Sequence, residues 1–509
     1  MKEYRTHLLK SCLEIPMFAP EAQPEGSQTC HVWNTQPKDV RVEDAARMSG
    51  PPSERAGLLD HDQTLHVWLP SHGCFAADKW RFAADTGMFK QLLRLFIMLT
   101  LAVSALTAGC RTADPVSYRL ETQPRAVLAE AGLTPSNDPR LALSHSGALH
   151  MLAVYGEHGQ AQLGLAISHD GGDTFQPPVP VSEQGALVSS HGENSPSLAL
   201  TPTEIYALWE QANEQGRPDL MFARSLTFGH SFEKPVRVAD KTEPSFNGFS
   251  SMAVAPDGQV YAVWLDGRDR AEPAGTFSVY LAKSTDRGAT FGKNIRVEPG
   301  ACPCCRAAIA FGSAGEVFVV WRKVFEGDIR DIVVSTSRDG GETFAAPVRV
   351  ALDQWKVPGC PHSGAAVARR DDRLYVAWYT EGGDGKGGIR VSWSDDGART
   401  FAPPSPVSAG ILDANHPSLS VSTDGTAMLV FQGRDPSKKD GWSPVQAYLV
   451  EITPRGVIGN PVPVPNSQKA ISYPVVAADS AGRVFVGWTE PGQKGGSDIM
   501  LSRGRKSQT

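Results

Sequence analysis

Short stretches of alternating apolar and polar residues, each containing an aromatic residue near its end, recur from about residue 149 onward. Four of them are IYALWE (205–210), VYAVWLD (260–266), VFVVWRK (317–323) and LYVAWYT (374–380). Their period of two and their short length are typical of β-strands rather than of helices. A second short apolar stretch precedes most of them across a Gly-containing turn, which indicates a β-hairpin.

A polar turn about twenty residues farther along repeats together with these strands. Three copies have the pattern S-x-D-x-G-x-T-F and two are variants of it: SHDGGDTF (168–175), SLTFGHSF (225–232), STDRGATF (284–291), SRDGGETF (337–344) and SDDGARTF (394–401). Successive copies begin 53 to 59 residues apart, and a further short strand follows the turn. Each repeat therefore contains four short strands and corresponds to one supersecondary unit.

Seven such units follow one another between residues 136 and 505. Tandem four-stranded antiparallel units predict an all-β fold, a β-propeller with one blade per unit. A single small sheet cannot bury both of its faces, so neighbouring blades must cover each other. We expect seven blades, with six as the alternative. The last unit lacks an outer strand, and VSYRLETQP (116–124), within a linker of residues 110–135, is expected to supply it and close the ring.

The composition agrees with a folded protein that does not bind nucleic acid. Hydrophobic residues make up 41% of the chain and charged residues 20%, which is typical of a globular body. The formal net charge is −6, and no basic run stands out beyond residue 110. The electrostatic signature of nucleic-acid binding is therefore missing from the sequence. We expect a monomer.

The segment MFKQLLRLFIMLTLAVSALTAGC (88–110) has the layout of a secretory signal peptide. Lys90 and Arg94 precede an apolar run too short to span a bilayer comfortably, and small residues follow it. LTAGC resembles the lipobox of bacterial lipoproteins, so Cys110 is expected to carry lipid. The protein would then be anchored to a bacterial membrane at the cell envelope, facing the periplasm or the exterior. Residues 1–87 are expected to be an over-extended start, with a cytoplasmic tail as the alternative.

The repeated turn resembles the Asp-box, or BNR, repeat of the sialidase (neuraminidase) superfamily. The Ser, Asp and Thr side chains of such a motif can bond the backbone of a tight turn, and its Gly can adopt positive φ. Strand order places the turn on the lower face of the propeller, opposite the face where family members have their active sites. We therefore expect a structural role for four aspartates: Asp170, Asp286, Asp339 and Asp396.

The resemblance also implies a set of arginines on the upper face. Sialidases grip the substrate carboxylate with three arginines, and a planar guanidinium binds carboxylates through two parallel hydrogen bonds. Arg306, Arg434 and either Arg268 or Arg322 are the candidates here. The family's Arg-Ile-Pro signature is represented only by Arg140, since Ile and Pro do not follow it.

The same resemblance implies the residues that would perform the reaction. Tyr473 is the candidate nucleophile, Glu193 its polarising partner and Asp266 the acid/base. This set predicts a sialidase-like exo-glycosidase that acts on glycans at the cell envelope. The alternative is a non-catalytic propeller lipoprotein that binds a glycan, a protein or a metal at the same face, because a fold alone does not establish a function.

Four cysteines beyond Cys110 gather in two segments expected on the upper face, ACPCCRAA (301–308) and GCPHSG (359–364). One interpretation is that Cys302, Cys304, Cys305 and Cys360 form two disulfides, as an exported protein permits. The other is a metal site in which these thiolates bind copper or zinc with His362, and with His416 or His191 as further ligands. No other cofactor is expected.

Overall fold

The structure is a computed structural model that describes residues 118–507, apart from 129–132, 134, 157–159, 214–215, 242–245, 272–275, 384, 438–442, 467 and 493–495. The predicted signal peptide, Cys110 and residues 1–87 lie outside the described residues, so those expectations stay predictions. Among the described residues, no helix is long and apolar enough to cross a membrane.

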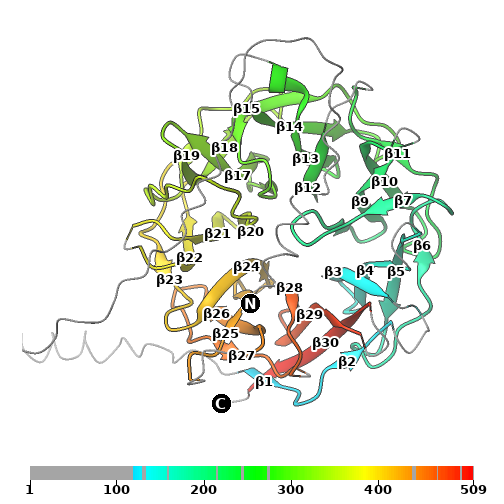
Figure 1. The fold of residues 1–509 in the computed structure, drawn as a ribbon. Helices are drawn as coiled ribbons and strands as arrows, with labels where there is room; N and C mark the ends of the chain where they lie inside the picture. The colour runs from blue at the N-terminus through cyan, green and yellow to red at the C-terminus, as the bar shows by residue number, and fades with distance from the viewer. Residues whose placement is uncertain are drawn as a thin grey trace, which may run out of the picture. The chain divides into compact units, whose positions relative to one another are not determined.

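The described residues form seven four-stranded antiparallel blades, which confirms the favoured prediction (Figure 1). The innermost strands are β3 (Ser136–Leu143), β8 (Ser197–Leu200), β12 (Asn247–Val254), β16 (Ala308–Phe311), β20 (Ala366–Arg370), β24 (Leu412–Val421) and β28 (Ser472–Ala478). The second strands are β4 (Leu149–Tyr155), β9 (Ile205–Ala212), β13 (Val260–Asp266), β17 (Val317–Phe325), β21 (Arg373–Thr380), β25 (Ala427–Arg434) and β29 (Arg483–Pro491).

The outer half of each blade completes the sheet. The third strands are β5 (Gln162–Ser168), β10 (Pro218–Ser225), β14 (Phe277–Ser284), β18 (Ile329–Ser337), β22 (Gly388–Ser394), β26 (Gln446–Ile452) and β30 (Ser497–Lys506). The outermost strands are β6 (Val179–Pro180), β11 (Val236–Arg237), β15 (Ile295–Ala301), β19 (Val348–Arg349), β23 (Ser405–Pro406), β27 (Val462–Pro463) and β1 (Tyr118–Leu120). Three further elements are β2 (Arg125–Ala126), β7 (Leu187–Ser189) and the 3₁₀ helix η2 (Arg268–Ala271).

The ring is closed at the last blade by a strand from the beginning of the described chain. Each innermost strand contacts the next one in chain order, and β28 contacts β3. β1 pairs antiparallel with β30, with Tyr118 opposite Lys506, and therefore supplies the outer strand that the last unit lacks. This pairing confirms the closing strand expected from the sequence.

The core lies between neighbouring blades, which explains why the second strands are apolar at almost every position. In β13, Val260, Ala262 and Trp264 pack against blade 2. The alternate residues Tyr261 and Val263 pack against blade 4. A strand with both faces covered buries both sets of its alternating side chains. The repeated tryptophans of these strands are almost fully buried: Trp209, Trp264, Trp321, Trp378 and Trp488.

The repeated turns join the third and fourth strands, and their polar side chains bond the turn itself. In the blade 4 copy, Ser337 Oγ donates to Asp339 Oδ1 at 2.7 Å and accepts from the amide of Gly341 at 2.8 Å. Asp339 Oδ1 also accepts from the amide of Thr343 at 3.0 Å. The hydrogen bonds of Thr343 and then of Ser337 hold the pKa of Asp339 well below its ordinary value.

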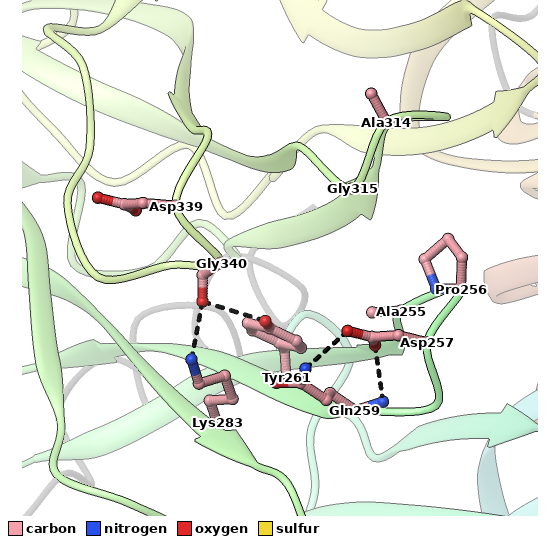
Figure 2. Close-up of a pocket in the computed structure, with 10 residues that line it drawn as sticks. All are labelled: Ala255, Pro256, Asp257, Gln259, Tyr261, Lys283, Ala314, Gly315, Asp339 and Gly340. Atoms are coloured by element: carbon pink, nitrogen blue, oxygen red, sulfur yellow. Dashed lines mark hydrogen bonds between the residues drawn. The ribbon is translucent and has the colours of Figure 1, made fainter.

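The repeated turn also links its blade to the preceding one. The carbonyl of Gly340 accepts hydrogen bonds from Tyr261 Oη at 3.0 Å and from Lys283 Nζ at 3.1 Å (Figure 2). A lower-face pocket of about 510 Å³, lined by Asp257, Tyr261, Lys283 and Asp339 among others, lies at this junction. The bonds support the structural role expected for these turns, so we assign the pocket to the scaffold.

Candidate functional site

The upper face is the face where the innermost strands begin, opposite the repeated turns. Four innermost strands carry a β-bulge at this end, where the pairing register shifts. The bulges contain Asp138, Phe249, His416 and Tyr473, whose φ angles lie between 49° and 52°. Positive φ is uncommon for residues other than glycine, and a bulge redirects a side chain out of the sheet's regular alternation. In four blades, therefore, the upper end of the innermost strand is irregular and directs a side chain out of the regular alternation.

Glu193, His416 and Tyr473 come together on the upper face from blades 2, 6 and 7. Glu193 Oε1 lies 2.9 Å from His416 Nδ1, and the amide of Gly364 donates to Glu193 Oε2 at 3.0 Å. The rings of His416 and Tyr473 are 4.3 Å apart between centroids. Burial by itself raises the pKa of Glu193. The hydrogen bond and the charge of His416 lower it by more than that, so the net pKa lies below its ordinary value. Glu193 is thus held as a carboxylate that orients the imidazole.

The loop before β8 encloses the ring of Tyr473. A Cβ atom at Gly192 would lie 2.0 Å from Tyr473 Cζ, so only glycine fits at this position. The amide of Gly192 donates to Asp138 Oδ1 at 3.2 Å, and Ser190 Oγ donates to Asp138 Oδ2 at 2.6 Å. Burial raises the pKa of Asp138. Asp138 therefore fixes the loop that packs on Tyr473, and it does so with a carboxyl group that resists ionisation.

Two arginines meet beside this group. Arg306 Nη1 donates to Ser195 Oγ at 2.8 Å and Arg306 Nη2 to the carbonyl of Pro196 at 3.2 Å. Arg140 donates to the same two residues, with Nε 2.9 Å from the carbonyl of Pro196. Burial, and then the charge of Arg140, lower the pKa of Arg306 well below its ordinary value. Two like charges in one place favour the binding of an anion between or beside them.

The arginine set expected from the sequence is not assembled. Arg322 is 1% exposed and donates to backbone carbonyls, those of Ser363 and Tyr379 among them, so it is a structural residue. Arg434 bonds Asp413 Oδ2 at 2.9 Å within its own blade. Of the candidate arginines, only Arg306 meets the Glu193 group, and its companion there is Arg140.

Asp266 and Arg268 are likewise partners of each other rather than members of the group around Glu193. Arg268 Nη2 lies 2.7 Å from Asp266 Oδ2, and its Nη1 lies 2.8 Å from Asp240 Oδ1. Trp264 Nε1 also donates to Asp266 Oδ2 at 2.8 Å, and Asp266 has no exposed surface. β13 buries the side chain of Asp266 in this ion pair, so the expected acid/base does not lie in the group around Glu193.

In this group, Asp138 was not selected from the sequence, and Arg140 was noted only as the part of the Arg-Ile-Pro signature that is present. A signal for the bulges was present: Asp138, His416 and Tyr473 each precede a proline at the start of an innermost strand. Proline removes a ladder hydrogen bond, so a recurring proline near a strand end indicates a bulge.

The buried carboxyl group of Glu210 is linked to the loop that carries Glu193 through hydrogen bonds of Asn194. Asn194 Nδ2 donates to Glu210 Oε2 at 2.6 Å, and Asn194 Oδ1 accepts from the amide of Phe249 at 2.6 Å. Burial raises the pKa of Glu210 to about 7. This chain of bonds connects β9 of blade 2 with the bulge of blade 3.

The four cysteines also gather at the upper face, as free thiols rather than disulfides. Cys302 Sγ lies 3.9 Å from Cys304 Sγ and 3.6 Å from Cys305 Sγ. Hydrogen bonds from the neighbouring thiols, supported by the charge of Arg330, lower the pKa of Cys302. Cys302, Cys304 and Cys305 are buried, whereas Cys360 is exposed.

No model of a protein family matches the chain, and no curated protein sequence matches it. Several solved structures are similar to the described fold. One is a protein of unknown function from Dyadobacter fermentans, with a TM-score of 0.42 and 15% identity, covering 78% of this chain and 98% of that one. Another is a Trypanosoma rangeli sialidase in complex with the inhibitor DANA, with a TM-score of 0.42 and 13% identity, covering 72% and 54%. A third is an α-L-arabinanase from Penicillium chrysogenum complexed with arabinobiose, with a TM-score of 0.41 and 12% identity, covering 60% and 92%.

The class that the blades define is a seven-bladed, four-stranded β-propeller. At these identities no residue role is transferred from the similar structures.

Proposed function

We propose that the upper face is the active site of a sialidase-like glycoside hydrolase that acts on acidic glycans. The observation that supports this best is the meeting of Glu193, His416 and Tyr473 from three blades. A tyrosine becomes a nucleophile when a nearby base accepts its proton, and an imidazole oriented by a carboxylate is such a base. Arg306 and Arg140 supply the positive charge that would bind the substrate carboxylate.

In the proposed reaction, the oxygen of Tyr473 forms a bond to the anomeric carbon while the glycosidic bond breaks. The proton of Tyr473 passes to His416, and the leaving oxygen takes a proton from Asp138. Asp138 suits that role because burial raises its pKa. Water then attacks the anomeric carbon and the bond between that carbon and the oxygen of Tyr473 breaks. Asp138 accepts a proton from that water, and His416 returns a proton to the departing oxygen of Tyr473. Asp138 thus replaces Asp266 in the role that the sequence suggested.

A fluorogenic sialoside assay tests this proposal. The unchanged chain should release the fluorophore, and Tyr473→Phe should lower kcat by about 10³-fold or more. Tyr261→Phe is the matched control, since it removes a hydroxyl group that bonds the carbonyl of Gly340 in a lower-face turn. Turnover that survives in Tyr473→Phe, or no turnover by the unchanged chain, would contradict a sialidase reaction with this nucleophile.

The second candidate is a propeller that binds an acidic ligand without cleaving it. One observation favours it: Arg140 and Arg306 meet at the carbonyl of Pro196, and two guanidinium groups in one place suit an acidic ligand whether or not it is cleaved. Calorimetric titration with sialyllactose distinguishes the two. Binding that is weakened by Arg306→Ala, with no product formed, supports the second candidate.

The proposed location is the cell envelope, with Cys110 as the lipidated residue. This part of the proposal rests on the sequence of residues 88–110 alone. Metabolic labelling with a radioactive fatty acid should mark the protein, and Cys110→Ser should abolish the label.

A further inference from the structure

A compact set of sulfur and imidazole ligands lies beside the Glu193 group and takes no part in the proposed reaction. Cys302, Cys304 and Cys305 lie in the connection from β15 of blade 3 to β16 of blade 4. Cys360 and His362 lie in the next connection, from β19 to β20. The ligand atoms form two overlapping triads, each with all its atoms within 4.8 Å of one another.

Cys304 belongs to both triads. One consists of Cys302, Cys304 and Cys305, and the other of Cys304, Cys360 and His362. The first triad is buried, while the second includes the exposed Cys360 and the half-buried His362. An ion bound by Cys304, Cys360 and His362 would therefore share Cys304 with the buried triad.

The sulfur separations in the buried triad match those of thiolates around one metal ion. Cys302 Sγ lies 3.9 Å from Cys304 Sγ and 3.6 Å from Cys305 Sγ. Thiolates about 2.3 Å from a shared metal stand roughly 3.7 to 4.0 Å apart in tetrahedral or trigonal geometry. A disulfide, in contrast, requires a separation of about 2.05 Å.

Backbone hydrogen bonds and one arginine position the segment that carries these sulfurs. The amide of Cys302 donates to the carbonyl of Arg322 at 2.9 Å, and the amide of Cys305 donates to the carbonyl of Cys302 at 3.4 Å. Arg330 Nη1 lies 3.1 Å from Cys302 Sγ. A fixed cation at that distance compensates part of the negative charge that several thiolates would bring into a buried site.

We propose that these five side chains bind Cu(I) in two three-coordinate sites that share Cys304 as a bridging thiolate. Soft thiolate and imidazole ligands favour Cu(I) and Zn(II) among the biological metals. Structural Zn(II) almost always takes four ligands in a closed tetrahedron, whereas each triad here offers three. Binding forms copper–sulfur bonds, releases the thiol protons to water and leaves the oxidation state of copper unchanged.

This site is separate from the proposed glycan site but adjoins it. Gly364, whose amide bonds Glu193, is two residues beyond His362. Copper binding can therefore be tested without any glycan substrate, and its failure leaves the hydrolase proposal untouched.

The test is an anaerobic titration of the reduced full chain with Cu(I) against the chelator bathocuproine disulfonate. We expect the Cys304→Ser variant to bind about two equivalents of copper fewer than the unchanged chain. About one equivalent should be lost on His362→Ala and on Cys360→Ser, which leave the buried triad intact. The other cysteines of the chain are present in every variant, so these differences assign the copper to the cluster.

His230→Ala is the matched control, because His230 is exposed at a lower-face turn, and it should bind as much copper as the unchanged chain. Saturation with Cu(I) should also raise the Tm by about 5 °C, and Cys304→Ser should abolish that rise. Cys360→Ser keeps the test informative if Cys304→Ser fails to fold.

Three results would overturn the proposal. The first is equal copper binding by the unchanged chain, Cys304→Ser and Cys360→Ser. The second is removal of the cluster's copper by a modest excess of Zn(II), which would assign the site to zinc. The third is the finding that Cys302, Cys304, Cys305 and Cys360 are unreactive toward a thiol reagent in denaturant until a reductant is added, which would show disulfides.

Discussion

The two faces of the propeller use polar side chains in opposite ways. On the lower face, each repeated turn bonds itself: Ser337, Asp339 and Thr343 interact within one stretch of eight residues, and the equivalent bonds recur at Ser284 and Asp286. On the upper face, Glu193 bonds His416 and Gly364, which are 223 and 171 residues away. A bond that recurs within the turns of several blades serves the scaffold, whereas a bond that occurs once and crosses blades can build a site.

This contrast has an energetic consequence. Contributions from separate repeats of a tandem architecture are approximately additive, because each repeat contacts only its neighbours. Residues that share one network of hydrogen bonds are coupled, so their contributions are not additive. The predictions below test this difference, from the largest expected effect to the smallest.

Gly192→Ala should have the largest effect, because it forces an upper-face loop into the ring of Tyr473. The added Cβ would lie 2.0 Å from Tyr473 Cζ, at a φ of +51°. We expect the free energy of unfolding to fall by about 3 to 4 kcal/mol, from overpacking and backbone strain together.

Gly185→Ala is the control for the backbone part of that loss, since Gly185 has a φ of +80° but no atom within 4 Å of the added Cβ. It should cost about 1 kcal/mol. Urea denaturation measures both, and equal losses in the two variants would contradict the close contact with Tyr473.

Glu210→Gln should change how stability depends on pH. The pKa of Glu210 is raised from 4.5 to about 7, so the folded state binds this proton more tightly than the unfolded state does. Its contribution is complete below pH 4.5 and is lost as the pH rises through 7. The neutral glutamine avoids that loss, so the variant should gain up to about 3 kcal/mol on the unchanged chain between pH 4 and pH 8.

Urea denaturation at several pH values measures this gain. Glu183→Gln, at an exposed position, should show the same pH dependence as the unchanged chain. If Glu210→Gln shows the same pH dependence as the unchanged chain, the pKa of Glu210 is the same in the folded and unfolded states and the interpretation of its burial is wrong.

Glu193→Gln and His416→Ala should be coupled. The two side chains bond each other at 2.9 Å and are nearly buried, with 11% and 13% of their side-chain surface exposed. We expect the double variant to differ from the sum of the single variants by about 1 to 2 kcal/mol. A thermodynamic cycle from urea denaturation measures this term, and a value of zero would remove the argument for a cooperative upper-face network.

Ser168→Ala and Ser337→Ala, in the separate blades 1 and 4, should each have a small effect, and the effects should add. Each serine donates to the aspartate of its own turn and accepts a hydrogen bond from the amide of the glycine four residues on. Loss of these bonds should lower the free energy of unfolding by about 1 kcal/mol per variant. The double variant should match the sum within about 0.5 kcal/mol and keep any sialoside turnover unchanged. Strong coupling between these two turns would contradict the view that each one acts locally.

Much of the fold was predictable, and part of the site was not. Alternating stretches such as VYAVWLD, and the repeated turns, identified the strands and the blade count, because these features depend on residues close together in the chain. The closing strand followed from the strand count, since the last unit lacks an outer strand and β1 supplies it. Tyr473, Glu193 and Arg306 were also placed on the correct face, since the order of strands within a blade decides which loops lie there. Asp266 and Arg322 do not join that group, because both side chains are buried and bond Arg268 and backbone carbonyls, respectively.

The sequence by itself determined the unit that repeats, since strand period and turn chemistry act within about twenty residues. Only the tertiary structure decided which upper-face side chains meet. His416 contacts Glu193 and Tyr473, and Arg306 is paired with Arg140, because closure of the ring brings residues from different blades together. The distances that separate these residues along the chain leave no local pattern from which such contacts can be read.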